Sequence, residues 1–123
     1  MRTVFVCSPY RAVGPDKKNK MKNNIDVAKR VCRKATLEGY QVACPHLFYS
    51  QFLDDDIPNE REIGINAGLS LLELSDEIWV VGNRITEGMS REIAKAGELG
   101  IPIKCVSDPL AQNRKILQEI IER

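Results

Sequence analysis

Long apolar segments are missing from this sequence of 123 residues. Runs such as residues 78–81 fall far short of the ~20 residues that span a bilayer, so no membrane-crossing helix is expected. The opening residues, Met-Arg-Thr-Val-Phe, are typical of a strand rather than of a signal sequence. We therefore expect a cytoplasmic protein that does not bind membranes.

An excess of charge of either sign is also missing. Eighteen Lys and Arg residues face 17 Asp and Glu residues, and the formal net charge is +1. Such a balance gives no electrostatic reason to expect nucleic acid or an anionic membrane as a partner. A small molecule or another copy of the chain is the expected partner.

Metal-binding patterns are absent too. The four cysteines show no CxxC spacing, and three of them lie in apolar, strand-like runs where thiols behave as small hydrophobic groups. A reactive or metal-binding thiol is the less favoured alternative. Only one histidine is present, so neither a metal site nor another cofactor is expected.

Strand-like and helical segments alternate along the chain, and the length fits a single domain over residues 1–123. Short β-branched runs predict strands at 3–7, 41–44, 77–82 and 101–106. Apolar residues at helical spacing predict helices at 24–38, 58–74, 88–99 and from 109 onward. Gly39 is expected to cap the first helix, and Asp108 the last. The last helix should turn four residues inward, Leu110, Leu117, Ile120 and Ile121. Residues 46–57 form a long connection, a candidate active-site loop.

This order predicts an α/β doubly wound fold. Strands separated by helices run parallel with right-handed crossovers, and the expected strand order is 2-1-3-4 with helices on both faces. In such sheets the ligand lies beyond the carboxyl ends of the strands, where the strand order reverses. The loops after Cys7 and after Val81 should therefore frame one binding crevice.

Glu92 is the most unusual residue of the sequence. On a helical wheel, Met89, Ile93 and Ala96 define the buried side of the third predicted helix, and Glu92 falls within this apolar arc. A helix start favours negative charge, and the Gly88 bend would let a ligand approach. A ligand-facing carboxylate is the favoured interpretation. The alternative is a glutamate in a capping box at the helix start.

The two crevice loops supply further candidates. Tyr10 is expected either to pack or to hold Glu92 by a hydrogen bond. Arg11, Arg84 and Ser90 are candidate anion contacts, with solvated surface arginines as the alternative. The other ligand-binding candidates in these loops are Ser8, Pro9, Gly82, Asn83, Gly88 and Met89.

Three further features each allow two interpretations. His46 is expected either to make structural hydrogen bonds or to contribute to the crevice, and we include it among the ligand-binding candidates. The run 54–56 of three aspartates indicates a solvated loop that caps the next helix, or else an acid or Mg²⁺ ligand. The lysines of residues 17–22 indicate a solvated helix start, or else a lid over an anionic ligand.

Several motifs together resemble the nucleoside 2-deoxyribosyltransferase-like superfamily, especially its small phage and bacterial branch of unassigned function. The similarity covers most of the chain and lies in VFVCSPYR, an Asn-rich first helix, CPHLF, FLDDDIPNEREIG, SDEIWVVG and ITEGMSREIAKAGELGIPI. The last segment is the most specific.

The resemblance implies roles for individual residues. Glu92 matches the nucleophile that attacks C1′ of the sugar, and Asp76 lies 16 residues before it, a spacing typical of the family. Tyr10 matches a residue that steadies the nucleophile, and Ser90 one that contacts a 5′-phosphate. The catalytic aspartate is replaced by Gly68, which leaves Glu60, Glu62, Asp55 and Asp56 as possible proton donors.

We therefore expect an N-glycosidase or deoxyribosyltransferase-like enzyme that acts on a nucleoside or nucleotide and forms a dimer or larger homo-oligomer. The second hypothesis is a non-catalytic protein that senses or sequesters a nucleotide-derived ligand, which the glycine at position 68 favours. The third is a structural or partner-binding domain, which would leave Glu92 without an explanation.

Overall fold

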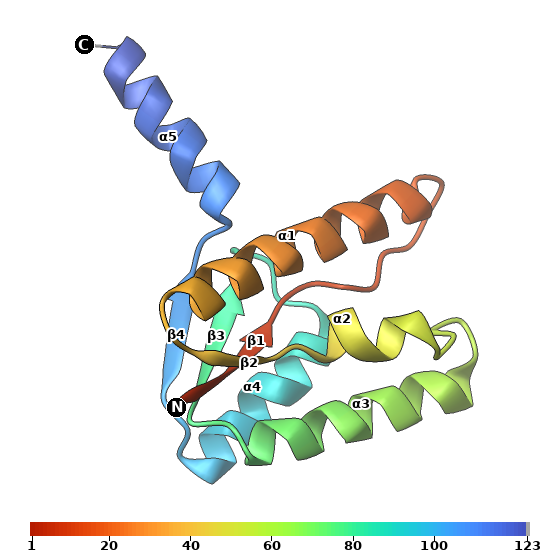
Figure 1. Ribbon diagram of the computed structural model, residues 1–123. Helices are drawn as coiled ribbons and strands as arrows, with labels where there is room; N and C mark the ends of the chain where they lie inside the picture. Colours follow the sequence, from red (N-terminus) through yellow and green to blue (C-terminus); the bar gives the residue numbers. More distant parts are fainter. Residues whose placement is uncertain (123) are drawn as a thin grey trace.

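A four-stranded parallel sheet lies at the centre of the protein, seen in the computed structural model of Figure 1, which describes residues 1–122 and the side chains of these except residues 112–115. Its strands are β1 (Thr3–Cys7), β2 (Gln41–Ala43), β3 (Glu77–Val81) and β4 (Ile103–Val106). The order is β2-β1-β3-β4, with all pairs parallel, so the predicted topology is confirmed.

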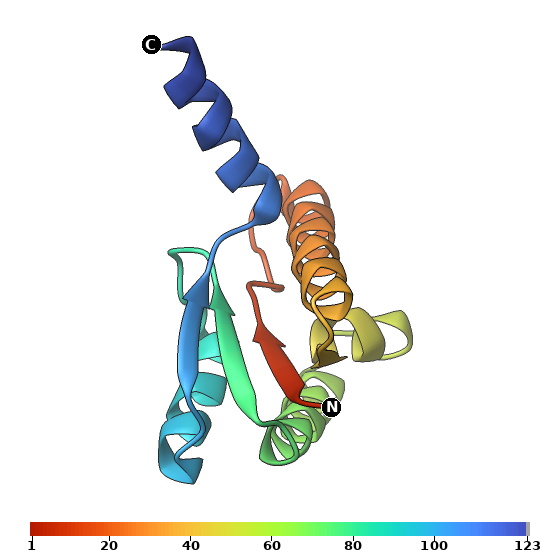
Figure 2. The ribbon, with the colours of Figure 1, turned by 60° about the vertical axis from the view of Figure 1, so that its left-hand side comes forward.

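The helices cover both faces of the sheet, as predicted (Figures 1 and 2). The 21-residue helix α1 (Lys17–Leu37) packs on one face, and α3 (Pro58–Glu73) and α4 (Glu87–Leu99) lie on the other. None of the described helices combines the length and the apolar character that crossing a bilayer requires.

Alternation along β1 divides the core between these faces. Val4 and Val6 pack with Trp79 and with the buried side of α1, whereas Phe5 and Cys7 pack with residues of α3 and α4. All four β1 side chains are fully buried. A strand that is apolar on both sides suits the middle of a sheet covered by helices.

Two predicted boundaries on the first half of the chain were wrong. Helix α1 begins at Lys17 rather than at residue 24, because its first two turns carry lysines and asparagines and bury no apolar side that periodicity could detect. Residues 46–57 are not one long loop, since they contain α2 (Pro45–Phe48) and the 3₁₀ turn η1 (Tyr49–Gln51). Strand β4 also begins at Ile103, two residues later than predicted.

Helix α5 (Pro109–Ile121) projects away from the sheet (Figures 1 and 2). Its predicted inward residues are exposed, up to 75% at Ile121. The prediction failed because an apolar stripe does not specify the surface that it packs against. Arg30 of α1 holds the start of α5 through two hydrogen bonds of 2.8 and 2.9 Å to the carboxylate of Asp108. Asp108 also caps the helix, as predicted, by accepting from Leu110.

Candidate functional site

A cavity of about 580 Å³ opens at the carboxyl edge of the sheet. The loop after β1 and the loop after β3 form two of its sides, as the predicted crevice requires. The third side comes from α2, η1 and the start of α3, the segment that had been expected to be a loop. The predicted residues that line the cavity are Tyr10, Arg11, His46, Arg84, Gly88 and Glu92.

Glu92 lies at the bottom of this cavity, which we call the floor and define by Glu92, Pro45 and Gly68. The residue is only 6% exposed, and its Oε1 atom has no hydrogen-bond partner among the described residues. Removal from water raises the pKa of Glu92 to about 7, and interaction with the Cys7 thiol opposes part of this shift. The carboxyl is therefore poised between its two protonation states near neutral pH.

The capping interpretation of Glu92 was wrong. Helix α4 begins at Glu87, and the hydroxyl of Thr86 caps it by accepting from the backbone of Met89 at 3.3 Å. Glu92 consequently lies in the second turn, beyond reach of the free N–H groups at the helix start. Nothing in the start of α4 requires a carboxylate at this position.

The space beside Glu92 is filled by a proline ring. A Cβ atom built on Gly68 would lie 3.9 Å from Oε2 of Glu92 but only 3.1 Å from Cγ of Pro45. Position 68 thus faces Glu92, as the position of the missing aspartate should, yet Pro45 occupies the room that a side chain there would need. No other acidic side chain of the described residues hydrogen-bonds Glu92.

Tyr10 and His46 form a stacked pair on the cavity wall, with ring centroids 5.2 Å apart and an interplanar angle of 15°. Burial lowers the pKa of His46 to about 4, so the ring is neutral at neutral pH. Burial is the largest cause of a raised pKa of Tyr10, and the negative charges of the aspartates at 54–56 raise it further. The predicted hydrogen bond between Tyr10 and Glu92 is absent, because Tyr10 packs on His46 instead.

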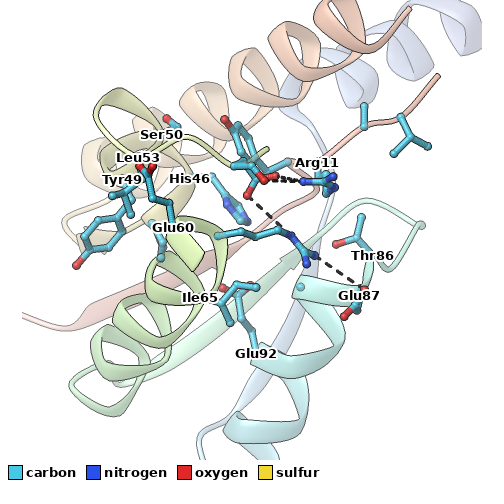
Figure 3. Close-up of a pocket in the computed structure, with 18 of the residues that line it drawn as sticks. Arg11, His46, Tyr49, Ser50, Leu53, Glu60, Ile65, Thr86, Glu87 and Glu92 are labelled. Carbon is cyan, nitrogen blue, oxygen red and sulfur yellow. Dashed lines mark hydrogen bonds and ion pairs between the residues drawn. The ribbon is translucent and has the colours of Figure 1, made fainter. Parts of the chain in front are cut away.

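Alternating charges span the mouth of the cavity in the order Arg11, Asp55, Arg61 and Glu87, and we call this set the rim. Figure 3 labels the two ends of the rim, Arg11 and Glu87. Arg11 donates to both the carboxylate and the backbone oxygen of Asp55, each at 2.8 Å. Arg61 lies 4.0 Å from Asp55 and 3.9 Å from Glu87. Arg11, expected to be a free anion contact, is thus already paired.

The remaining predicted ligand contacts do not line the cavity. Ser8 is fully buried with an unpaired hydroxyl, and Met89 belongs to the core under α4. Pro9 is half-buried, whereas Gly82, Asn83 and Ser90 are exposed outside the cavity. The start of α4 borders the cavity through Thr86, Glu87 and Gly88, but Ser90 does not line it, so the predicted phosphate contact of Ser90 has no geometric support.

Sequence reasoning missed most of the third wall. Its lining residues include Tyr49, Ser50, Leu53, Gly64, Ile65 and Arg61. The aspartate run contributes Asp55 to the wall but does not cap α3, since the capping residue is Ile57 without a side-chain hydrogen bond. The aromatic residues within 46–57 were the available signal, because a solvated loop rarely carries a Phe-Tyr pair.

The lysine run at the start of α1 lies partly at the cavity. Lys20 lines the cavity entrance, and Lys17 pairs with the carboxylate of Asp56. Among the residues that the structure describes, no group of three or more His, Cys, Asp or Glu residues could hold a metal ion.

The fold resembles a solved structure described as 2-deoxyribosyltransferase from the psychrotolerant bacterium Bacillus psychrosaccharolyticus. The two are 17% identical, and the match covers 85% of this chain and 72% of that chain with a TM-score of 0.58. At this identity the similarity establishes a shared deoxyribosyltransferase-like fold. A comparison with curated proteins gives no match.

A family model matches residues 2–106, which include all four strands and every residue of the cavity. Only α5 and its connection lie beyond the match. The chain therefore belongs to the family described as Domain of unknown function (DUF7768).

Proposed function

We propose that this protein is an N-glycosidase or deoxyribosyltransferase-like enzyme that acts on a nucleoside or nucleotide. The carrying observation is Glu92, a buried carboxyl at the floor of a cavity whose Oε1 atom has no hydrogen-bond partner among the described residues. Leaving a buried polar group unpaired is costly, so such a group is seldom kept for stability. The name of the structural relative, a 2-deoxyribosyltransferase, supports a nucleoside as the ligand.

In the proposed reaction, the ionised carboxylate of Glu92 attacks C1′ of the sugar. The bond between C1′ and the base nitrogen breaks, and its electron pair leaves with the base, which takes up a proton. The glycosyl-enzyme ester then reacts at C1′ with water or a second base, which releases Glu92. The cavity is large enough for such a ligand, at about 580 Å³.

Two acidic residues remain candidates for the proton donor to the base. Asp55 and Glu60 line the cavity, whereas Glu62 pairs with Arg91 on the surface and Asp56 pairs with Lys17. Of the four acids considered from the sequence, Asp55 and Glu60 therefore keep support. Tyr10 and His46 would bound the ligand from the opposite wall through their stacked rings.

A specific observation favours a second candidate function, the non-catalytic binding of a nucleotide-derived ligand. Pro45 fills the space beside Glu92 where the resemblance places a catalytic aspartate, so position 68 supplies no second acid to Glu92. A binding protein needs the cavity but not a proton donor. The same residues would then sense or sequester the ligand.

One experiment separates these functions. The protein is incubated with a panel of nucleosides and 5′-nucleotides, base release is followed by chromatography, and binding by thermal shift. Base release supports the enzyme, whereas a thermal shift without release supports the binding protein. If no compound of the panel gave either signal, both proposals would fail and a structural or partner-binding role would replace them.

We further propose that the chain is a single cytoplasmic domain without nucleic acid as a partner, and that it belongs to the small phage and bacterial branch of its superfamily.

We also propose that the chain forms a homo-oligomer. Support for the oligomer comes from exposed apolar residues: Leu74 at the end of α3 is 79% exposed, and α5 exposes Leu117, Ile120 and Ile121. A C2 contact is the commonest way to cover such surfaces. Light scattering at micromolar concentration should give at least a dimer mass, and a monomer mass would contradict the proposal.

A further inference from the structure

Arg61 occupies an unusual position in the rim. It comes from the first turn of α3, lines the cavity and lies between Asp55 and Glu87. Its side chain is only 24% exposed, so most of its water has been removed. A guanidinium group in such a place normally donates several hydrogen bonds.

The contacts of Arg61 are too long to be hydrogen bonds. The nitrogen to oxygen distances are 4.0 Å to Asp55 and 3.9 Å to Glu87, and hydrogen bonds of this kind end near 3.2 Å. No described residue accepts a hydrogen bond from the side chain of Arg61. Arg61 therefore lines the cavity as a cation with free N–H donors.

Arg11 faces Arg61 across a single carboxylate. Asp55 is bonded at 2.8 Å to Arg11 and lies 4.0 Å from Arg61, so one acidic group stands between two guanidinium groups. Two cations around one anionic group form the arrangement in which arginines hold phosphate, because planar guanidinium donors fit its oxygens in pairs. In the free protein Asp55 takes the place of that anion.

We propose that Arg61 and Arg11 together bind a phosphate group of the ligand, and that this phosphate displaces the carboxylate of Asp55. The inference rests on the proposed function, because it names the anionic part of the ligand that the same cavity would hold. It differs from the predicted anion site around Ser90, a residue that lies outside the cavity.

Displacement of the two acidic residues costs little. Pairs between partly exposed charges are weak because solvent screens them, so the protein loses little stability when they separate. Glu87 is 67% exposed and has a second partner in Arg91 at 3.3 Å, which can keep its charge paired after release. Phosphate carries more charge than a carboxylate and offers more oxygens to the free donors of Arg61.

The position of this site also suits the chemistry of the floor. Arg61 and Glu92 line the same cavity, Arg61 between the charged groups of the rim and Glu92 at the floor. A nucleotide held by its phosphate at the rim would direct its sugar toward the floor. The rim would thereby orient the sugar so that Glu92 can attack C1′. Phosphorylated ligands should also bind better than bare nucleosides.

Titration with inorganic phosphate tests this site without any nucleoside. Calorimetry at constant ionic strength would compare the unchanged protein with Arg61→Ala, Asp55→Asn and the control Arg2→Ala. Arg2 is an exposed arginine at the opposite edge of the sheet, so its removal changes the net charge equally. We expect Arg61→Ala to weaken phosphate binding about tenfold or more, because a charge-assisted contact is lost.

The opposite result is expected for Asp55→Asn. This variant removes the group that competes with phosphate, so binding should become several-fold tighter, whereas a residue that contacts the ligand would show weaker binding on substitution. Arg2→Ala should stay within about twofold of the unchanged protein, as expected for a screened, distant charge. If Asp55→Asn does not fold, Glu87→Gln replaces it and should also tighten binding, by a smaller factor.

Several outcomes would overturn the proposal: no phosphate binding at millimolar concentration, equal weakening by Arg61→Ala and Arg2→Ala, or weaker binding when the competing carboxylate is neutralised. The result is separate from the glycosidase question. If phosphate binds as described but the nucleotide panel shows no base release, the anion site stands and the proposed reaction fails. If the panel shows base release but phosphate does not bind, the proposed reaction stands and the anion site fails.

Discussion

The floor and the rim of the cavity differ in how their charged groups are paired and exposed. At the floor, Glu92 is buried, its Oε1 atom has no hydrogen-bond partner among the described residues, and its pKa is raised to about 7. At the rim, every cation has a carboxylate within 4.0 Å, and the groups are partly exposed. We propose that this difference reflects function: the floor keeps a destabilising carboxyl for reactivity, whereas the rim can exchange its partners for a ligand at little cost.

The largest expected effect is the loss of turnover in Glu92→Gln. The amide cannot attack C1′, so base release should fall at least about a hundredfold. Melting temperature should stay unchanged or rise, because the amide removes a buried ionisable group. Both quantities are measured on the same variant, by chromatography and by thermal unfolding. A variant that melts early and keeps full activity would remove Glu92 from the proposed mechanism.

The next effect is a pH dependence of stability that comes from Glu92. Its pKa is about 7 in the folded state against 4.5 for an ordinary glutamate, so the folded protein holds a proton that the unfolded chain releases. The contribution is complete below pH 4.5 and is lost as the pH rises to about 7. Its size is on the order of 3 kcal/mol. The ionised form needed for attack grows over the same range, so turnover should rise.

Urea unfolding of the unchanged protein and of Glu92→Gln from about pH 5 to pH 8 measures this contribution. His46 has the opposite influence, because its pKa is lowered to about 4 and its contribution is lost as the pH falls below 6.5. His46 acts in both proteins, so the difference between their unfolding free energies at each pH isolates the contribution of Glu92. A difference in unfolding free energy that does not change with pH would contradict the buried, unpaired state of this carboxyl.

A smaller effect is expected from Gly68→Ala, which adds a methyl group to the floor. The new Cβ would lie 3.1 Å from Cγ of Pro45, so overpacking should cost about 1–3 kcal/mol, partly offset by better helix propensity. Gly97→Ala in α4 is the matched control, because its Cβ meets nothing within 4 Å. We expect the control to be neutral or stabilising by up to ~1 kcal/mol. Equal melting temperatures for the two variants would show that Pro45 does not confine the floor.

The smallest effect is expected just outside the rim. Glu62→Gln breaks the surface ion pair between the Glu62 carboxylate and the Arg91 guanidinium, which lie 3.0 Å apart. Both side chains are more than a third exposed. The free energy of unfolding should change by less than ~1 kcal/mol, and phosphate binding should not change. A large loss of stability, measured by urea unfolding, would mean that the charge network around the cavity is structural rather than exchangeable.

The sequence predicted the sheet and the floor better than the rim. The strands follow from β-branched runs and their parallel direction from the helical crossovers, whereas the order 2-1-3-4 was an expectation that only the structure confirms. Glu92 was found because a carboxylate within an apolar arc stands out on a helical wheel. Arg61 could not be found in this way, since an arginine in the first turn of a helix is usually a solvated residue. Its role depends on α2 and η1, which bring Asp55 to the cavity and which no periodicity indicated.

The position of β1 in the sheet has a consequence for how the chain folds. This strand pairs with β3, whose residues follow it by 73 positions, as in the pair Val4 and Glu77. Its apolar side chains are synthesised well before those of β3, so the edge that pairs with β3 stays uncovered until that later strand has emerged. Such distant parallel pairing is slow to form, and the waiting strand is open to self-association. Chaperones that act during synthesis should therefore increase the yield of folded protein, while the stability of the folded state stays the same.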